Sequence, residues 1–366
     1  MRLQLTTIAL FCITLNTALV SGRNGDTWPA SGSVEPPRIT EQNSGTGQFL
    51  QAVHAVSSSV VWAAGYGGTV LRSTDGGETW QQLRTPVGDS LQFRDVYALN
   101  ADTAWLLSIG NGSASRIYRT NNGGSTWALQ FINRDTAAFY DCISFEDHLH
   151  GVAFGDASHG RSNILRSSDG GENWTQLPQS AAPSPLAGEG AFAASGQCVA
   201  HSAGEPGRVF IATGSPGARL FRSSDAGSSW EVIETPFVKG TVAGLTGVDF
   251  RGSRGIAVAA DINRLRTDTS SNVVGTSNDG GSTWTLGKRP PLPGALAGVA
   301  WIPGAGPGFA AASGYGGAFY TSDSGQSWTT ITDLVTAGVS AYDRTVWIAG
   351  ANGKIWRLDF LVAKPG

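Results

Sequence analysis

Charged side chains are scarce in this chain of 366 residues: they make up 14%, and the formal net charge is only −3. No long basic run occurs, so the composition does not favour a surface for nucleic acid or anionic membranes. Hydrophobic residues reach 40%, which supplies a sizeable core and excludes a disordered tail or a coiled coil. The 50 glycines lack a G-X-Y period, which excludes collagen.

Several motifs of cofactor and catalytic sites are also missing. No Gly-x-Gly-x-x-Gly follows a strand and opens a helix, no phosphate-binding loop occurs, and no Gly-x-Ser-x-Gly elbow is present. His148 and His150 flank a short turn beside Glu146 and Asp147, but no His-x-x-x-His or Cys-x-x-Cys spacing supports a metal site. We therefore expect no metal and no cofactor.

The first 22 residues are typical of a secretory signal peptide. An early arginine precedes an apolar stretch that ends at about Val20, and the small residues Ser21 and Gly22 follow. We expect cleavage after Gly22, a flexible segment at 23–35, and export to a periplasm or out of the cell. A retained N-terminal anchor is the alternative. No other stretch approaches the length of a membrane span, so we expect none after signal removal.

One eight-residue pattern recurs six times, and its copies start 44 to 56 residues apart. This spacing is typical of four-stranded propeller blades. The copies are STDGGETW (73–80), TNNGGSTW (120–127), SSDGGENW (167–174), SSDAGSSW (223–230), SNDGGSTW (277–284) and TSDSGQSW (321–328).

Each copy, called a box below, reads as the tip of a β-hairpin. The glycines supply the positive φ of a tight turn, the Asp side chain accepts backbone N–H groups, and the Trp covers the turn. We interpret these residues as structural and not catalytic. They are Asp75, Asn122, Asp169, Asp225, Asp279 and Asp323, with Trp80, Trp127, Trp174, Trp230, Trp284 and Trp328.

Each box is preceded by three short apolar segments and followed by a fourth, all with the composition of strands. After the sixth box come three more such segments, AGVSAY, TVWIAG and KIWRLDF, without a box. We predict an all-β fold, one seven-bladed β-propeller at 36–360 with a tail at 361–366, in which PPRITEQ (36–42) completes the last blade and closes the ring. Six blades with a loose tail is the alternative.

The boxes resemble the Asp-box, or BNR, repeat of bacterial sialidases, sortilins, xyloglucanases and photosystem II assembly factors. Asn122, Ala226 and Ser324 depart from that pattern. The single-propeller length, the signal peptide and the run GYGGTVLRSTDGGETW (65–80) are most like the photosystem II assembly-factor group. This resemblance implies an exported, non-catalytic scaffold that binds a protein or assists assembly, without implying a photosynthetic source.

The face opposite the boxes, called the loop face below, carries the longer loops, at 133–141, 155–163, 178–196 and 261–272. Glu189, Asp156 and Asp141 are the catalytic candidates, because two carboxylates at the right separation can hydrolyse glycosides. The alternative, which we favour, is that they accept backbone N–H groups and hold loops. The candidate binding residues are Arg161, His159, Arg264, Arg266, Tyr140, Tyr66 and Tyr315, with Phe139 as a further stacking candidate.

Two features of the repeat concern its scaffold. Cys142 and Cys198 occupy the same repeat position, and equivalent side chains face the same way, so we expect no bridge although an exported chain favours one. An arginine also recurs at one position before the box, which indicates packing or pairing between strands. These arginines are Arg72, Arg119, Arg166, Arg222 and Arg357.

Two other functions remain open. A glycosidase of the sialidase type would need an early Phe-Arg-Ile-Pro segment, and the nearest segment here, PPRIT, lacks the Phe and the second Pro. Xyloglucanase-type enzymes pair two propellers, and this chain has the length of one. A carbohydrate- or peptide-binding module is the third possibility. We expect a monomer whose partner is a protein, or else a glycan, and no nucleic acid.

Overall fold

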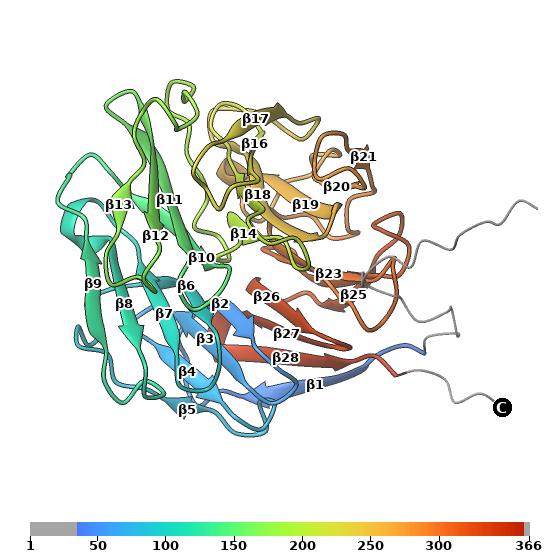
Figure 1. Ribbon diagram of the computed structural model, residues 1–366. Helices are drawn as coiled ribbons and strands as arrows, with labels where there is room; N and C mark the ends of the chain where they lie inside the picture. Colours follow the sequence, from blue (N-terminus) through green and yellow to red (C-terminus); the bar gives the residue numbers. More distant parts are fainter. Residues whose placement is uncertain (1–34, 362–366) are drawn as a thin grey trace, which may run out of the picture.

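The computed structural model describes residues 35–361, and these form seven four-stranded antiparallel sheets around a central axis (Figure 1). The expected signal peptide, nearly all of the segment 23–35 and nearly all of the tail lie outside the described residues. The predicted fold, an all-β seven-bladed propeller, is therefore confirmed, and the six-bladed alternative is wrong.

In each of the first six blades, four consecutive strands run from the axis outward. Blade 1 holds β2 (Leu50–Ala55), β3 (Val61–Gly65), β4 (Val70–Ser73) and β5 (Gln81–Gln82). Blade 2 holds β6 (Phe93–Ala98), β7 (Ala104–Ser108), β8 (Arg116–Thr120) and β9 (Ala128–Ile132). Blade 3 holds β10 (Tyr140–Phe145), β11 (Gly151–Ser158), β12 (Arg161–Ser167) and β13 (Thr175–Gln176). Blade 4 holds β14 (Val199–His201), β15 (Val209–Ala212), β16 (Arg219–Ser223) and β17 (Glu231–Glu234). Blade 5 holds β18 (Ala243–Arg251), β19 (Arg254–Asp261), β20 (Val274–Ser277) and β21 (Thr285–Leu286). Blade 6 holds β22 (Leu296–Trp301), β23 (Ala310–Gly314), β24 (Gly317–Thr321) and β25 (Thr329–Thr332).

The seventh blade is built from both ends of the described chain. It holds β26 (Thr336–Tyr342), β27 (Thr345–Gly350), β28 (Lys354–Asp359) and, as its outer strand, β1 (Arg38–Asn43). The register of β1 on β28 runs from Arg38 opposite Asp359 to Asn43 opposite Lys354. Closure pairs the free edge that blade 7 would otherwise expose, as predicted. Three single turns of 3₁₀-helix complete the secondary structure of residues 35–361: η1 (Gly112–Ala114), η2 (Ile262–Arg264) and η3 (Ala351–Gly353).

The core lies between neighbouring blades. The second strand of most blades is buried on both sides and carries large side chains, among them the fully buried Trp62, Trp105 and Trp347. One cluster joins Leu50 and Val53 of blade 1 to Trp347 and Ile355 of blade 7, so apolar contact continues across the ring closure.

Each box forms the turn that its residues predict. Asp75 accepts the N–H of Thr79 at 2.9 Å and its hydroxyl at 2.5 Å, and Gly76 and Gly77 take φ of +75° and +90°. The hydrogen bonds to the Thr79 side chain and backbone lower the pKa of Asp75 to about 2. Asn122 makes the same pair of contacts to Thr126 through Oδ1 and Nδ2, at 2.9 and 2.8 Å.

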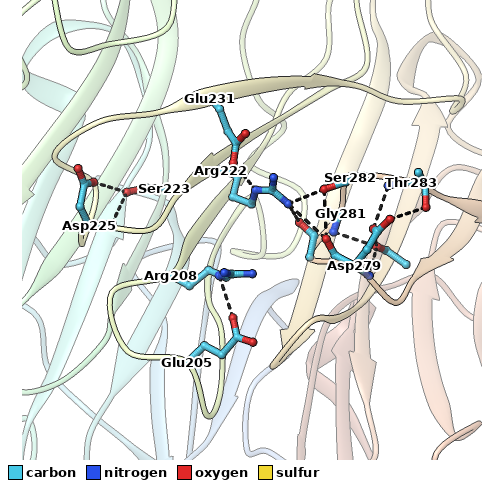
Figure 2. Close-up of polar contacts among 12 residues, drawn as sticks. Glu205, Arg208, Arg222, Ser223, Asp225, Glu231, Asp279, Gly281, Ser282 and Thr283 are labelled. Carbon is cyan, nitrogen blue, oxygen red and sulfur yellow. Dashed lines mark hydrogen bonds and ion pairs between the residues drawn. The ribbon is translucent and has the colours of Figure 1, made fainter.

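The recurring arginines reach into the next blade. Arg222 Nη1 donates to the carbonyl of Gly280 at 2.6 Å and to Ser282 Oγ at 2.8 Å in the box of blade 5, while its Nε donates to Glu231 (Figure 2). Arg166 reaches Ala226 O of blade 4 at 2.9 Å, and Arg357 reaches Gly76 O of blade 1 at 3.2 Å. These arginines therefore link blade to blade, and Arg72 and Arg222 also pair with the neighbouring outer strand of their own blade.

The expectation for the two cysteines is wrong, because Cys142 and Cys198 form a disulfide. Both do occupy equivalent positions, on β10 and just before β14. However, the inner strands converge around the axis, and these two Cα atoms lie 5.8 Å apart, within the usual range for a disulfide. The bridge joins blade 3 to blade 4 beside the channel.

Candidate functional site

The segment 190–197 closes the central channel at the loop face. Ser195 Oγ donates to Ala297 O at 2.9 Å and Gln197 Nε2 to Val339 O at 3.0 Å, so the segment contacts blades 6 and 7. From the other side, Arg94 of blade 2 donates to Ala193 O at 3.3 Å. The segment 190–197, which overlaps the C-terminal part of the longest predicted loop, therefore serves as a plug, called the channel plug below.

β-Bulges in the inner strands direct polar side chains toward this end of the channel. The register shifts between Leu50 and Ala52, between Phe93 and Asp95, and between Tyr140 and Cys142. A β-bulge leaves its extra residue unpaired and redirects its side chain. The residues at the three bulges are Gln51, Arg94 and Asp141, and all three line one cavity beside the channel plug.

This cavity, called the loop-face cavity below, has a volume of about 500 Å³. Its wall includes Asp141, Asp156 and Glu189, so the structure brings the three carboxyl candidates together. Aromatic side chains form much of the rest, from Phe139, Phe192 and Tyr315. A mixture of apolar wall and few polar groups in this size range is typical of ligand sites.

Glu189 is fully engaged in holding the loop. Its carboxylate pairs with Arg219, which donates from both Nε and Nη2, and both side chains are nearly inaccessible. It also accepts the Thr213 hydroxyl at 2.7 Å and the Leu186 N–H at 2.9 Å. These four donors hold the Glu189 carboxylate in place, so Glu189 fixes the position of its loop, which agrees with the favoured loop-holding interpretation.

Asp141 and Asp156 form a carboxyl pair. Burial raises the pKa of Asp141 well above its usual range, and the nearby charge of Asp156 raises it further. Burial also raises the pKa of Asp156 to about 6, although the Ala191 N–H, 3.2 Å from Oδ1, opposes that rise. The two carboxyl groups lie close enough together for each to shift the pKa of the other. Asp141 therefore retains its proton to a higher pH than an ordinary carboxyl group, and it is the member of the pair that holds the proton more firmly.

Arg94 lines the loop-face cavity and contacts Tyr66. The Arg94 guanidinium lies 5.4 Å from the centre of the Tyr66 ring, and Nη2 donates to the Tyr66 hydroxyl at 3.0 Å. Arg94 also lowers the pKa of Asp141 through its charge, without forming an ion pair within 4 Å among residues 35–361. Sequence reasoning singled out Tyr66 and Tyr315 but missed Arg94, Gln51 and Phe192.

The remaining binding candidates do not gather at this cavity. His159 lies 3.1 Å from Asp135 on an exposed turn with Arg161, and Arg264 pairs with Asp261 at 3.2 Å. Tyr140 is only 4% exposed and its hydroxyl donates to Gln176, so it offers no ring for stacking. Arg266 is not part of the cavity wall, but its charge acts on Tyr315, which is.

A second, narrower cavity of about 200 Å³ lies in the channel and is bounded by Ser195, Gly196 and Gln197 of the channel plug. Burial lowers the pKa of His54 to about 4 and that of His201 to about 3, so both imidazoles are neutral at physiological pH. His201 Nδ1 lies 3.0 Å from Ser144 Oγ. Within residues 35–361 no group of His, Cys, Asp and Glu could hold a metal ion.

In the described part of the chain, no helix is long and apolar enough to cross a bilayer.

Comparison with known proteins places the chain by its fold. No protein-family model matches it. A YCF48 structure bound to D1 peptide covers 89% of this chain and 95% of its own, with a TM-score of 0.61 and 16% identity. A virginiamycin B lyase from Staphylococcus aureus, crystallised with quinupristin, covers 89% of this chain and all of its own, with a TM-score of 0.66 and 12% identity.

The chain shares the β-propeller fold of these proteins. A xyloglucanase from Paenibacillus sp. is 28% identical over 136 residues, which are 30% of this chain and 13% of that enzyme. The chain thus matches only about an eighth of the curated relative's length. An assembly factor, a lyase and a glycosidase are all similar to it, so the fold does not choose among these functions.

Proposed function

We propose that this chain is an exported, non-catalytic β-propeller that binds a protein partner through the loop face and acts as a scaffold or assembly aid. The observation that carries the proposal is the state of the three carboxyl groups in the loop-face cavity. Glu189 is neutralised by Arg219, and Asp141 retains its proton beside Asp156. These contacts leave no pair of free carboxyl groups for acid–base catalysis, although the cavity can still bind a ligand group.

The geometry argues against the glycosidase alternative. Retaining glycosidases place their two carboxyl groups about 5 Å apart and inverting ones place them further apart. Here Asp141 and Glu189 are each only 1% exposed, so Asp156 has no second accessible carboxyl group among the three candidates. The partial match to a xyloglucanase is the observation that keeps this alternative in view.

The similar YCF48 structure supports binding of a peptide, since it was solved with D1 peptide bound and it covers most of both chains. In our proposal the rigid ring presents the loop face, and the loop-face cavity receives a side chain of the partner. Export rests on the N-terminal segment, which has the features of a signal peptide.

Two experiments test this function. Random peptides displayed on phage are selected against the purified protein, and bound clones are retested on Phe192→Ser, in the cavity wall, and on Glu172→Gln, in the box of blade 3. We expect clones whose binding is lost with Phe192→Ser and kept with Glu172→Gln.

In parallel, sialosides and plant and bacterial polysaccharides are assayed for released reducing ends. Turnover that Asp156→Asn or Glu189→Gln abolishes would make the protein a glycosidase and end the scaffold proposal.

A further inference from the structure

The Asp141–Asp156 pair lacks a positive partner. Among residues 35–361 no Lys or Arg nitrogen lies within ion-pair distance of either carboxyl group, whereas the neighbouring Glu189 has Arg219. Asp141 is 1% exposed, and its Oδ2 has no donor from any other described residue. Two buried carboxyl groups with no cation retain a proton in its place.

A further polar atom at the same wall is unpartnered. Gln51 is 1% exposed and its Nε2 donates to Ala194 O, but its Oε1 accepts from nothing in the described residues. The wall therefore offers three acceptors, from Asp156, Asp141 and Gln51. An ammonium group has three N–H donors and one positive charge, which is the complement of this set.

The rest of the loop-face cavity suits a carbon chain that ends in such a group. Its walls include the rings of Phe139, Phe192 and Tyr315 and the side chain of Leu265. An alkyl stem can lie along apolar walls while its charged head finds acceptors, and aromatic faces attract a cation further. A volume of about 500 Å³ exceeds what one lysine side chain fills, so part of the partner's backbone can enter too.

We propose that the loop-face cavity is a binding site for a primary alkylammonium group, with Asp156 as the carboxylate that meets it and Asp141 and Gln51 as the acceptors behind. This inference rests on the proposed function, in which the ammonium is a lysine side chain of the protein partner. A free diamine carries the same chemistry and is the alternative source.

The other charged and titratable groups around the pair do not already satisfy it. Arg94 faces Asp141 but is held by the Tyr66 hydroxyl, Gln92 and Ala193 O. Glu189 and Arg219 cancel each other. Burial raises the pKa of Tyr315, so its hydroxyl stays neutral.

Binding of the ammonium group then competes with protonation of Asp156, because the ligand's charge takes the place of a proton on that carboxylate. Because the pKa of Asp156 is about 6, we expect affinity for an ammonium ligand to fall about tenfold between pH 7 and pH 5, with a proton released on binding. A neutral ligand of the same shape gains nothing from this exchange and shows no such dependence.

The test is an NMR or calorimetric titration of the purified protein with Nα-acetyl-lysine methylamide, its Nε-acetylated counterpart and cadaverine, at about pH 5 and pH 7. We expect the lysine probe to bind at pH 7 at least tenfold more tightly than the Nε-acetylated probe, and to weaken at pH 5. Preference for cadaverine would assign the site to a free diamine and would overturn the lysine assignment.

Matched variants complete the design. Asp156→Asn removes the carboxylate that meets the ligand and should abolish the charge preference and the pH dependence, while Glu172→Gln, far from the cavity on the box face, should change neither. Circular dichroism checks that each variant is folded, and Asp141→Asn serves as a second cavity variant if Asp156→Asn does not fold. Equal binding of both lysine probes, or binding unaffected by both cavity variants, would overturn the site.

The same measurements separate the two proposals. Peptides selected on the loop face that contain no lysine, and whose binding ignores Asp156→Asn, would refute the ammonium site and leave the scaffold function standing. Failure of every displayed peptide to bind would refute the scaffold function, and the lysine probe would still report on the ammonium site.

Discussion

Replacing Asp141 by Asn should change how the protein's stability depends on pH. Asn keeps the shape of the protonated acid, and its amide can donate a hydrogen bond as the carboxyl proton can. It also removes the titration of a group whose pKa burial raises well above the usual range. The substitution therefore changes packing very little, and its effect is seen in how the free energy of unfolding depends on pH.

The sign follows from proton linkage. In the unfolded chain Asp141 loses its proton near its ordinary pKa of 3.8, while in the folded protein it keeps that proton to a much higher pH. Its contribution to stability is therefore complete below about pH 4 and is lost as the pH rises toward the folded pKa. Each pH unit between the unfolded and the folded pKa of Asp141 lowers the free energy of unfolding by about 1.4 kcal/mol.

Reversible urea denaturation of the wild type and Asp141→Asn at several pH values between about 5 and 7 measures this difference. We expect the free energy of unfolding of the wild type to fall more steeply with pH than that of the variant, by as much as about 1.4 kcal/mol per pH unit. Burial also raises the pKa values of Asp95 and Asp249, but both groups are present in both proteins and cancel. Parallel profiles would show that Asp141 is ionised in the folded state and would refute the retained proton.

Three further results are expected. Arg222→Ala should lower the free energy of unfolding by about 1–3 kcal/mol in urea titrations, since it leaves Gly280 O of the next blade without its donor; a change under 0.5 kcal/mol would contradict the inter-blade link. The double variant Cys142→Ala, Cys198→Ala should lose about 2–4 kcal/mol, and the denatured, oxidised mature protein should show no reactive thiol from this pair; two free thiols would contradict the bridge. Asn122→Asp should fold with unchanged or greater thermal stability, because Asp75 shows the same contacts made by a carboxylate; a lower melting temperature would contradict the structural equivalence of the boxes.

The repeat made the architecture predictable because its period and chemistry are local. Six boxes located six hairpin tips, and the three segments after the last box required a partner strand from the other end of the chain. That partner begins at Arg38 and ends at Asn43, one residue beyond the predicted segment. The departures from the pattern keep the same backbone, since Ala226 and Ser324 take φ of +55° and +60° where glycine is usual.

The candidate site was only partly predictable. Asp141, Asp156 and Glu189 were singled out as acids near inner strands, but their partners depend on a bulge of β10 at Asp141 and on the folded position of the Glu189 loop, which no local pattern encodes. Gln51, Arg94, Asp141 and Gln197 occupy one position of the repeat, and aligning the blades on that position was the signal that could have revealed the mouth of the channel. The disulfide was mispredicted for the same reason, because convergence at the axis is a property of the whole ring.

The pairing of β1 with β28 has a consequence for the order in which the molecule assembles. Blades 1 to 6 each draw their strands from one continuous stretch, so each can form soon after that stretch leaves the ribosome or the export channel. Blade 7 cannot form until the last strand has emerged, because its outer strand was made first and its inner three were made last. Until then the leading strand waits unpaired with an open edge, and the final hydrogen bonds of the chain are the ones that convert an open arc into a ring.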